Sequence, residues 1–224
     1  MNIWVLDLDR VLQLPAYDHP NLFRDLSAAI GVPFDQLFEH YTKEFVGNES
    51  EEGYHLSLCT TEEQRAAVSD IWQKLRHNLP KVTIVPGARQ LLEQIENRGE
   101  PIFAWTKGVS TEGIQRTRLE SIGLGSFFPE GRIVSSPRKG TKEGLEHDLL
   151  PKLPSGRKIL VGDSFDQDIT PALHREDFVC VWVRWDQSFP KGLDPNDTSL
   201  ILVKDVQELL RLVREGRFDV KYNH

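Results

Sequence analysis

Short apolar runs that alternate with helix-like segments constrain this chain more than any other feature. Because these runs are apolar throughout, we expect strands that are buried on both faces. Strand–helix alternation of this kind is typical of a parallel sheet that helices cover on both sides. Strands are expected at 2–6, 101–106, 132–135, 158–161, 178–183 and 200–203. Helices are expected at 88–97, 110–122, 141–150, in a short stretch ending at 173, and at 205–215.

The sequence therefore predicts an α/β fold, with a Rossmann-like three-layer core around a parallel sheet and a small all-helical cap domain. The core comprises 1–14 and 81–224, and the cap comprises 15–80. Helices are expected in the cap at 21–30, 33–46 and 60–78, with a loop at 48–53 and a capping box from Thr60 to Glu63. This segment is either an ordinary insertion or a lid over a site at the carboxyl ends of the strands, where such sheets bind ligands.

Composition limits the classes of binding partner and the cellular compartment that we expect. The net charge of -7 does not favour long nucleic acid, whose binding usually needs a basic face. Cys59 and Cys180 are far apart and form neither a disulfide framework nor a CxxC metal site. No signal peptide or membrane span is evident, so we expect a cytoplasmic protein. The sequence leaves the oligomeric state open.

Two of the expected strands end in carboxylates. Asp7 and Asp9 follow the strand at 2–6, and Asp163 and Asp168 follow the strand at 158–161. Charges at the end of a buried strand are unfavourable unless something compensates them, and Mg²⁺ binds such carboxylate oxygens. The alternative for the first pair is a solvated strand end that happens to hold two aspartates. Two acidic strand ends in one sheet can converge on one metal ion.

Two further positions suit a phosphoryl group. The strand at 101–106 ends in Thr106, whose hydroxyl can bind a phosphate oxygen. The alternative for Thr106 is routine helix capping, which Ser110 could provide instead. Lys139 and Lys142 both lie near the start of the helix at 141–150, and a cation there could neutralise phosphoryl charge. The two lysines remain alternatives at this point.

In this order, the four motifs resemble those of the haloacid dehalogenase-like (HAD) superfamily over nearly the whole chain. The first motif stands as Asp7-Leu8-Asp9-Arg10-Val11, the second as Thr106, the third fits Lys139 best, and the fourth is Gly162, Asp163 and Asp168. The segment between the first and second motifs looks like the helical cap that usually sets substrate choice in this superfamily.

The resemblance implies a mechanism. Asp7 would attack phosphorus and form an aspartyl-phosphate, while Asp9 would act as general acid and then as general base. Thr106 and Lys139 would hold the phosphoryl oxygens. Mg²⁺ would be held by Asp7, the Asp9 main-chain carbonyl, Asp163 and Asp168. Dehalogenases of the superfamily lack the second aspartate, so Asp9 favours phosphate chemistry.

The sequence departs from the family pattern beside two motifs. Arg10 replaces a common glycine and Lys107 a common asparagine, and either could meet an anionic group of the substrate. The alternative for each is a surface side chain. We predict Mg²⁺-dependent hydrolysis of a small phosphomonoester. The alternatives are a phosphomutase of the same fold and a weakly active or non-catalytic module that binds a partner. The sequence does not identify the substrate.

Overall fold

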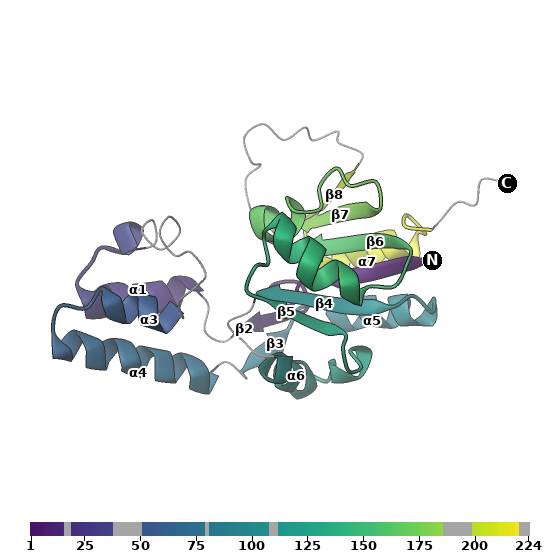
Figure 1. Cartoon of the computed structure of the whole chain (residues 1–224). Helices are drawn as coiled ribbons and strands as arrows, with labels where there is room; N and C mark the ends of the chain where they lie inside the picture. Colours follow the sequence, from purple (N-terminus) through teal and green to yellow (C-terminus); the bar gives the residue numbers. More distant parts are fainter. Residues whose placement is uncertain (16–18, 38–50, 79–80, 108–111, 186–198, 220–224) are drawn as a thin grey trace. The chain divides into compact units, whose positions relative to one another are not determined.

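The structure is a computed structural model that describes residues 1–15, 19–37, 51–78, 81–107, 112–185 and 199–219. It forms two compact units (Figure 1). The larger unit comprises Met1–Leu14 and Val82–His224, and the smaller unit is Pro15–Lys81. The role of the smaller unit as a cap stays a prediction.

The larger unit contains a six-stranded sheet in which all neighbouring strands are parallel. The strand order is β5-β4-β1-β6-β7-β8, so the first strand of the chain lies inside the sheet. The bounds are β1 Asn2–Leu6, β4 Ile102–Lys107, β5 Ile133–Ser136, β6 Arg157–Gly162, β7 Phe178–Val183 and β8 Leu200–Val203. The predicted α/β fold with a parallel sheet is confirmed.

Helices and short helical turns follow the strands. The regular helices are α5 Ala88–Asn97, α6 Glu112–Ser121 and α7 Val206–Arg214. The segment predicted as a helix at 141–150 forms a π-helical turn, η2 Gly144–Leu149, and then a 3-10 turn, η3 Leu150–Lys152. The short helix predicted up to residue 173 is the π-helical turn η4 Phe165–Ile169, and a 3-10 turn, η1 Gly125–Phe127, follows α6.

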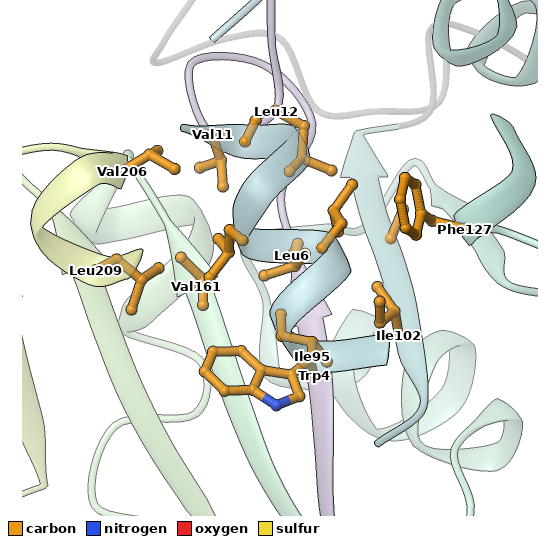
Figure 2. Close-up of a cluster of buried hydrophobic side chains, with 14 of the residues drawn as sticks. Trp4, Leu6, Val11, Leu12, Ile95, Ile102, Phe127, Val161, Val206 and Leu209 are labelled. Atoms are coloured by element: carbon orange, nitrogen blue, oxygen red, sulfur yellow. The ribbon is translucent and has the colours of Figure 1, made fainter. Parts of the chain in front are cut away.

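Alternate residues of the strands pack on opposite faces of the sheet, as the pleat requires. Trp4 and Leu6 of β1 join the apolar cluster that α5 and α7 cover, which Figure 2 shows in close-up. Ile3 and Val5 of the same strand join a second cluster with residues of η2 and η4. All four side chains are fully buried. Helical layers therefore cover both faces, as in the predicted three-layer core.

A second, two-stranded sheet was not predicted from the sequence. It pairs β2 Gln13–Pro15 with β3 Val82–Ile84, the segments on either side of the long insertion. The amide of Val85 also donates to the carbonyl of Leu12 at 3.0 Å. The turn that follows β1 is therefore held in place by contacts between the segment before the insertion and the segment after it.

The smaller unit is helical in the part that the structure describes. Its helices are α1 His19–Ile30, α3 Glu51–Ser57 and α4 Glu62–Asn78. They pack around an apolar core of their own that includes Phe23, Tyr54 and Trp72. Within the described ranges, no helix is long and apolar enough to cross a membrane.

Two local predictions in this unit were wrong. Residues 51–53 begin α3 instead of ending a loop, because Tyr54 and His55 are buried against the other helices and hold the segment helical. The capping box of α4 lies one residue later than predicted: the Gln64 amide donates to Thr61 Oγ1 at 3.2 Å, and Gln64 Oε1 accepts from the Thr61 amide at 3.2 Å. Most of the helix predicted at 33–46 lies outside the described residues.

Candidate active site

Neighbouring strand ends bring three aspartates together. Asp7 follows β1 directly, and Asp163 and Asp168 follow β6, its neighbour in the sheet. The register pairs Leu6 with Val161, and the Asp7 amide donates to the Val161 carbonyl at 2.8 Å. One carboxylate oxygen from each aspartate lies within 4.8 Å of the other two. We call Asp7, Asp163 and Asp168 the aspartate cluster.

The turn after β6 brings Asp168 back to the end of its own strand. The Ser164 amide donates to Asp168 Oδ2 at 2.9 Å, and the Asp168 amide donates to the Ser164 carbonyl at 2.8 Å. Asp168 is 2% exposed. A Cβ atom at Gly162 would lie 2.1 Å from Asp168 Cβ, so this close approach requires glycine.

Of the two candidate lysines, Lys139 joins the cluster. Its ammonium contacts the Asp7 carboxylate and lies 2.6 Å from Asp168 Oδ1. Lys139 is 6% exposed, whereas Lys142 is exposed. The Lys139 amide donates to the Ser136 carbonyl at 3.2 Å, so the turn after β5 directs its side chain into the cluster.

The cluster contains more negative charge than Lys139 neutralises. Burial raises the pKa of Asp7 well above its usual range; Lys139 opposes this, and Asp168 and Asp163 add to it. Burial and then Asp168 raise the pKa of Asp163 to about 7. Burial opposes the charge on Lys139, but Asp168 and Asp7 together raise the pKa of Lys139 above its usual value. The raised pKa values of Asp7 and Asp163 reflect burial first, and repulsion from the other aspartates adds to it.

The donor set of the aspartate cluster fits a hard divalent cation. Such ions bind carboxylate oxygens, and the three oxygens are close enough to converge on one ion. A cation would also offset the excess negative charge. The part predicted for the Asp9 main-chain carbonyl stays a prediction.

The Asp9 side chain lies in a different set of contacts. Asp9 Oδ1 accepts from Gln13 Nε2 at 3.1 Å and from an Arg118 guanidinium nitrogen at 3.2 Å. Gln115 Oε1 accepts from the same two groups, from Gln13 Nε2 at 3.3 Å and from Arg118 at 3.1 Å. Two donors and two acceptors thus close a ring. We call Asp9, Gln13, Gln115 and Arg118 the Asp9 ring.

Thr106 is linked to this ring. It is 4% exposed near the end of β4, and its Oγ1 accepts from Gln115 Nε2 at 3.4 Å. Because the hydroxyl oxygen accepts here, its own hydrogen is left to donate to another group, such as a phosphate oxygen. The predicted phosphate ligand is therefore joined to the predicted acid through Gln115 and then through Gln13 or Arg118.

Lys107 and Arg10, the two basic residues that depart from the family pattern, differ in exposure and in contacts. Lys107 is half-buried at the end of β4, and across the described ranges its ammonium forms no ion pair. Arg10 is exposed and has a positive φ of 61°, a conformation that favours glycine, which is the common family residue here. Its carbonyl accepts from Trp185 Nε1 at 3.2 Å. The pKa of Asp163, raised mainly by burial, is partly lowered by the Arg10 charge.

Sequence reasoning missed Gln13, Gln115 and Arg118. All three are at most 2% exposed. One signal was available for α6: Gln115 and Arg118 share the face of buried Leu119, with the spacing of an apolar stripe. Polar residues at such positions indicate a buried polar network rather than a solvated face.

Comparisons with known proteins bear on the fold. The sequence matches no protein-family model, and comparison with curated proteins gives no match. Among solved structures, a HAD phosphatase from Thermococcus onnurineus has a TM-score of 0.55 and 16% identity, over 95% of this chain and 98% of that one. A protein described as a HAD-hydrolase from Bacillus subtilis, bound to magnesium, has a TM-score of 0.60 and 15% identity, over 95% and 98%.

A third solved structure is described as a beta-phosphoglucomutase from Thermotoga maritima. Its TM-score is 0.59 and its identity 14%, over 96% of this chain and 99% of that one. The chain therefore has the fold of HAD-like proteins along nearly its whole length. At these identities the likeness concerns the fold, and the chemistry must be argued from the residues of the site.

Proposed function

We propose that this chain is a HAD-like phosphatase that hydrolyses a small phosphomonoester through an aspartyl-phosphate, with Mg²⁺ as cofactor. One observation carries the proposal: Asp7 lies at the end of a buried central strand, in contact with Lys139 and within reach of Asp163 and Asp168. A buried carboxylate held by an ammonium, in a cluster suited to a cation, is typical of a nucleophile in phosphoryl transfer.

In the first step an Asp7 carboxylate oxygen attacks phosphorus, and the bond from phosphorus to the leaving oxygen breaks. Asp9, two residues on and with its side chain 45% exposed, donates a proton to that oxygen, so the alcohol leaves. In the second step Asp9 takes a proton from water while the water oxygen attacks phosphorus. The bond from Asp7 to phosphorus breaks, and inorganic phosphate and free Asp7 are formed.

The remaining residues bind and orient. Asp7, Asp163 and Asp168 would hold Mg²⁺. When bound, the ion would supply positive charge to the phosphoryl oxygens and to the cluster. The Lys139 ammonium and the Thr106 hydroxyl are suited to the phosphoryl oxygens, since both are buried donors.

The comparisons support this proposal without identifying a substrate. The T. onnurineus neighbour is named as a phosphatase, and the B. subtilis neighbour binds magnesium. The net charge of -7 favours a small phosphorylated metabolite over nucleic acid. Arg10 and Lys107 are the basic side chains proposed to contact its second anionic group, if it has one.

The test is phosphate release from a panel of phosphorylated metabolites, with Mg²⁺ or with chelator, by wild type and Asp7→Asn. We expect release that requires both Mg²⁺ and Asp7. Acid quenching with substrate labelled in the phosphoryl group should leave label on wild-type protein, removable by hydroxylamine, and none on Asp7→Asn. Full Mg²⁺-dependent turnover by Asp7→Asn would show that the nucleophile is wrongly assigned.

The T. maritima neighbour favours a second candidate, a phosphomutase. Such an enzyme uses the same aspartates but returns the phosphoryl group to another hydroxyl of the sugar. Turnover of a sugar phosphate to its isomer, without release of phosphate, would support the mutase. No turnover of any compound would favour the non-catalytic, partner-binding alternative.

A further inference from the structure

We infer that Arg118 is a positioning residue: through the Asp9 ring it sets which oxygen of Asp9 exchanges a proton with the substrate, and it couples Asp9 to Thr106. This inference rests on the proposed function, in which Asp9 protonates the leaving group. Arg118 lies on α6, 109 residues from Asp9 in sequence, and has no place in the motifs that suggested the site.

The chemistry of the groups fixes the direction of every hydrogen bond in the ring. Arginine only donates, and Asp9 Oδ1 accepts both when the carboxylate is ionised and when the acidic proton is on Oδ2. Asp9 Oδ1 therefore receives hydrogens from Arg118 and Gln13, and Gln115 must turn its oxygen toward Arg118. Gln115 Nε2 is then directed to Thr106 Oγ1. The guanidinium thus determines the amide orientation that leaves the Thr106 hydroxyl hydrogen for the phosphoryl group.

The same contacts distinguish the two oxygens of Asp9. Gln13 and Arg118, the two donors of the ring, both bind Oδ1. Oδ2 is the oxygen that remains for proton transfer, and the Asp9 side chain is 45% exposed, so a substrate can reach it. Without the guanidinium, Asp9 would keep Gln13 as a donor and could rotate about its side-chain bonds.

The burial of the Arg118 side chain indicates a role beyond packing. Its side chain is 3% exposed, and a buried guanidinium is unfavourable unless it is paired. Asp9 is the carboxylate that pairs with it among the described residues. Among the described residues, Arg118 Nε has no hydrogen-bond partner, so the burial of the guanidinium is incompletely compensated. Apolar residues in place of a buried ion pair are often neutral or stabilising, so packing alone does not explain an arginine beside Leu119, whereas its pairing with Asp9 does.

The test uses two substrates that differ in their need for an acid. An alkoxide leaves phosphorus only when protonated, whereas p-nitrophenolate leaves readily without a proton. The probes are p-nitrophenyl phosphate and glycerol 2-phosphate, or the alkyl phosphomonoester that the panel ranks highest. The measured quantity is the ratio of kcat/KM for the alkyl over the aryl phosphate. Both values come from one preparation, so the ratio does not depend on the folded fraction.

Three variants are compared with wild type. Arg118→Met should lower the ratio by about tenfold, a part of the roughly 10²–10⁴ that a general acid contributes. Arg118→Lys should lower it less, because the charge stays but the two-pronged geometry is lost. Arg116→Met is the matched control: Arg116 lies on the same helix but donates to the Phe128 carbonyl at 2.9 Å, and its ratio should equal that of wild type.

A combined variant separates action through Asp9 from other effects. In an Asp9→Asn background, Arg118→Met should not change the ratio further, since the proton donor is already absent. Equal losses of kcat/KM on both substrates, or an Arg116→Met ratio that falls as far, would overturn the positioning role and leave the proposed function intact. A wild type that releases phosphate from neither compound would overturn the proposed function and the inference together.

Discussion

The aspartate cluster and the Asp9 ring both contain an aspartate of the first motif, but their charges are balanced differently. The cluster sets three carboxylates against the single ammonium of Lys139, and the pKa of Asp163 rises to about 7, first through burial. The ring sets one carboxylate against one guanidinium, with two neutral amides that bridge them.

The difference indicates two kinds of preorganisation. The cluster is incomplete in charge, so its geometry is suited to recruiting a cation. The ring is balanced in charge, and its four hydrogen bonds have fixed directions, so it orients groups without a ligand. Asp7 and Asp9, two residues apart, thus belong to two sites whose charges are balanced differently, and variants of the two sites should lose different properties.

The largest separation should be in activity. Asp7→Asn should lower kcat/KM by roughly 10⁴-fold or more, the scale seen when a covalent nucleophile is removed. Asp9→Asn should lower it by about 10²–10⁴-fold for alkyl phosphates. Steady-state phosphate release measures both, and circular dichroism serves as the control for folding. Equal losses in the two variants on an aryl phosphate would contradict the division of roles.

Mg²⁺ affinity should change in variants of the aspartate cluster but not in variants of Arg118. Asp163→Asn should weaken Mg²⁺ binding by about tenfold or more, because it removes one of the three charged donors. Arg118→Met should bind Mg²⁺ as wild type does. Isothermal titration calorimetry of the metal into protein stripped with chelator measures both. Wild-type affinity in Asp163→Asn would contradict the assigned site.

Variants of the Asp9 ring should change the free energy of unfolding. Asp9→Asn leaves Arg118 buried without its carboxylate, and should lower the free energy of unfolding by about 1–3 kcal/mol. This is below the usual figure for a broken buried pair because the Asp9 side chain is 45% exposed. Adding Arg118→Met should recover part of the loss, as measured by urea unfolding. A double variant less stable than Asp9→Asn would contradict this.

The smallest effect concerns pH in the absence of metal. The folded pKa of Asp163 is about 7 and its ordinary value is 3.8, so between them the folded protein holds a proton that the unfolded chain has lost. Stability from this group is therefore present at low pH and is lost as pH rises through about 7. Thermal unfolding in chelator should show Tm falling from pH 5 to pH 8, less steeply in Asp163→Asn. A Tm that rises over this range would contradict the shift.

The sheet was predictable because its strands are apolar on both faces. The bounds of β7 and β8 agree with the prediction to the residue, as do those of α5. β2 and β3 were missed because strands of three residues have no measurable alternation, and Pro15 argues against one of them. The start of α3 was missed because tertiary contacts decide it rather than local propensity.

The site was predictable in part for a related reason. Strand ends are visible in a sequence, so the aspartates and Thr106 could be placed at one edge of the sheet. The choice between Lys139 and Lys142 needed the turn after β5. The spacing of Arg118 beside Leu119 indicated a buried side chain, but it did not identify the partner of Arg118, which lies 109 residues away.

The position of β1 inside the sheet also bears on when activity can arise as the chain is made. Asp7 and Asp9 leave the ribosome before the other residues of the site, yet Lys139 lies 132 residues beyond Asp7, and Gln115 lies 102 beyond Gln13. Contacts so far apart in sequence form late, since the intervening chain must first be synthesised and closed into a loop. A nascent chain that ends before β6 has the proposed nucleophile but neither Asp163 nor Asp168. The proposed activity can therefore arise only after the chain has been made at least through Asp168.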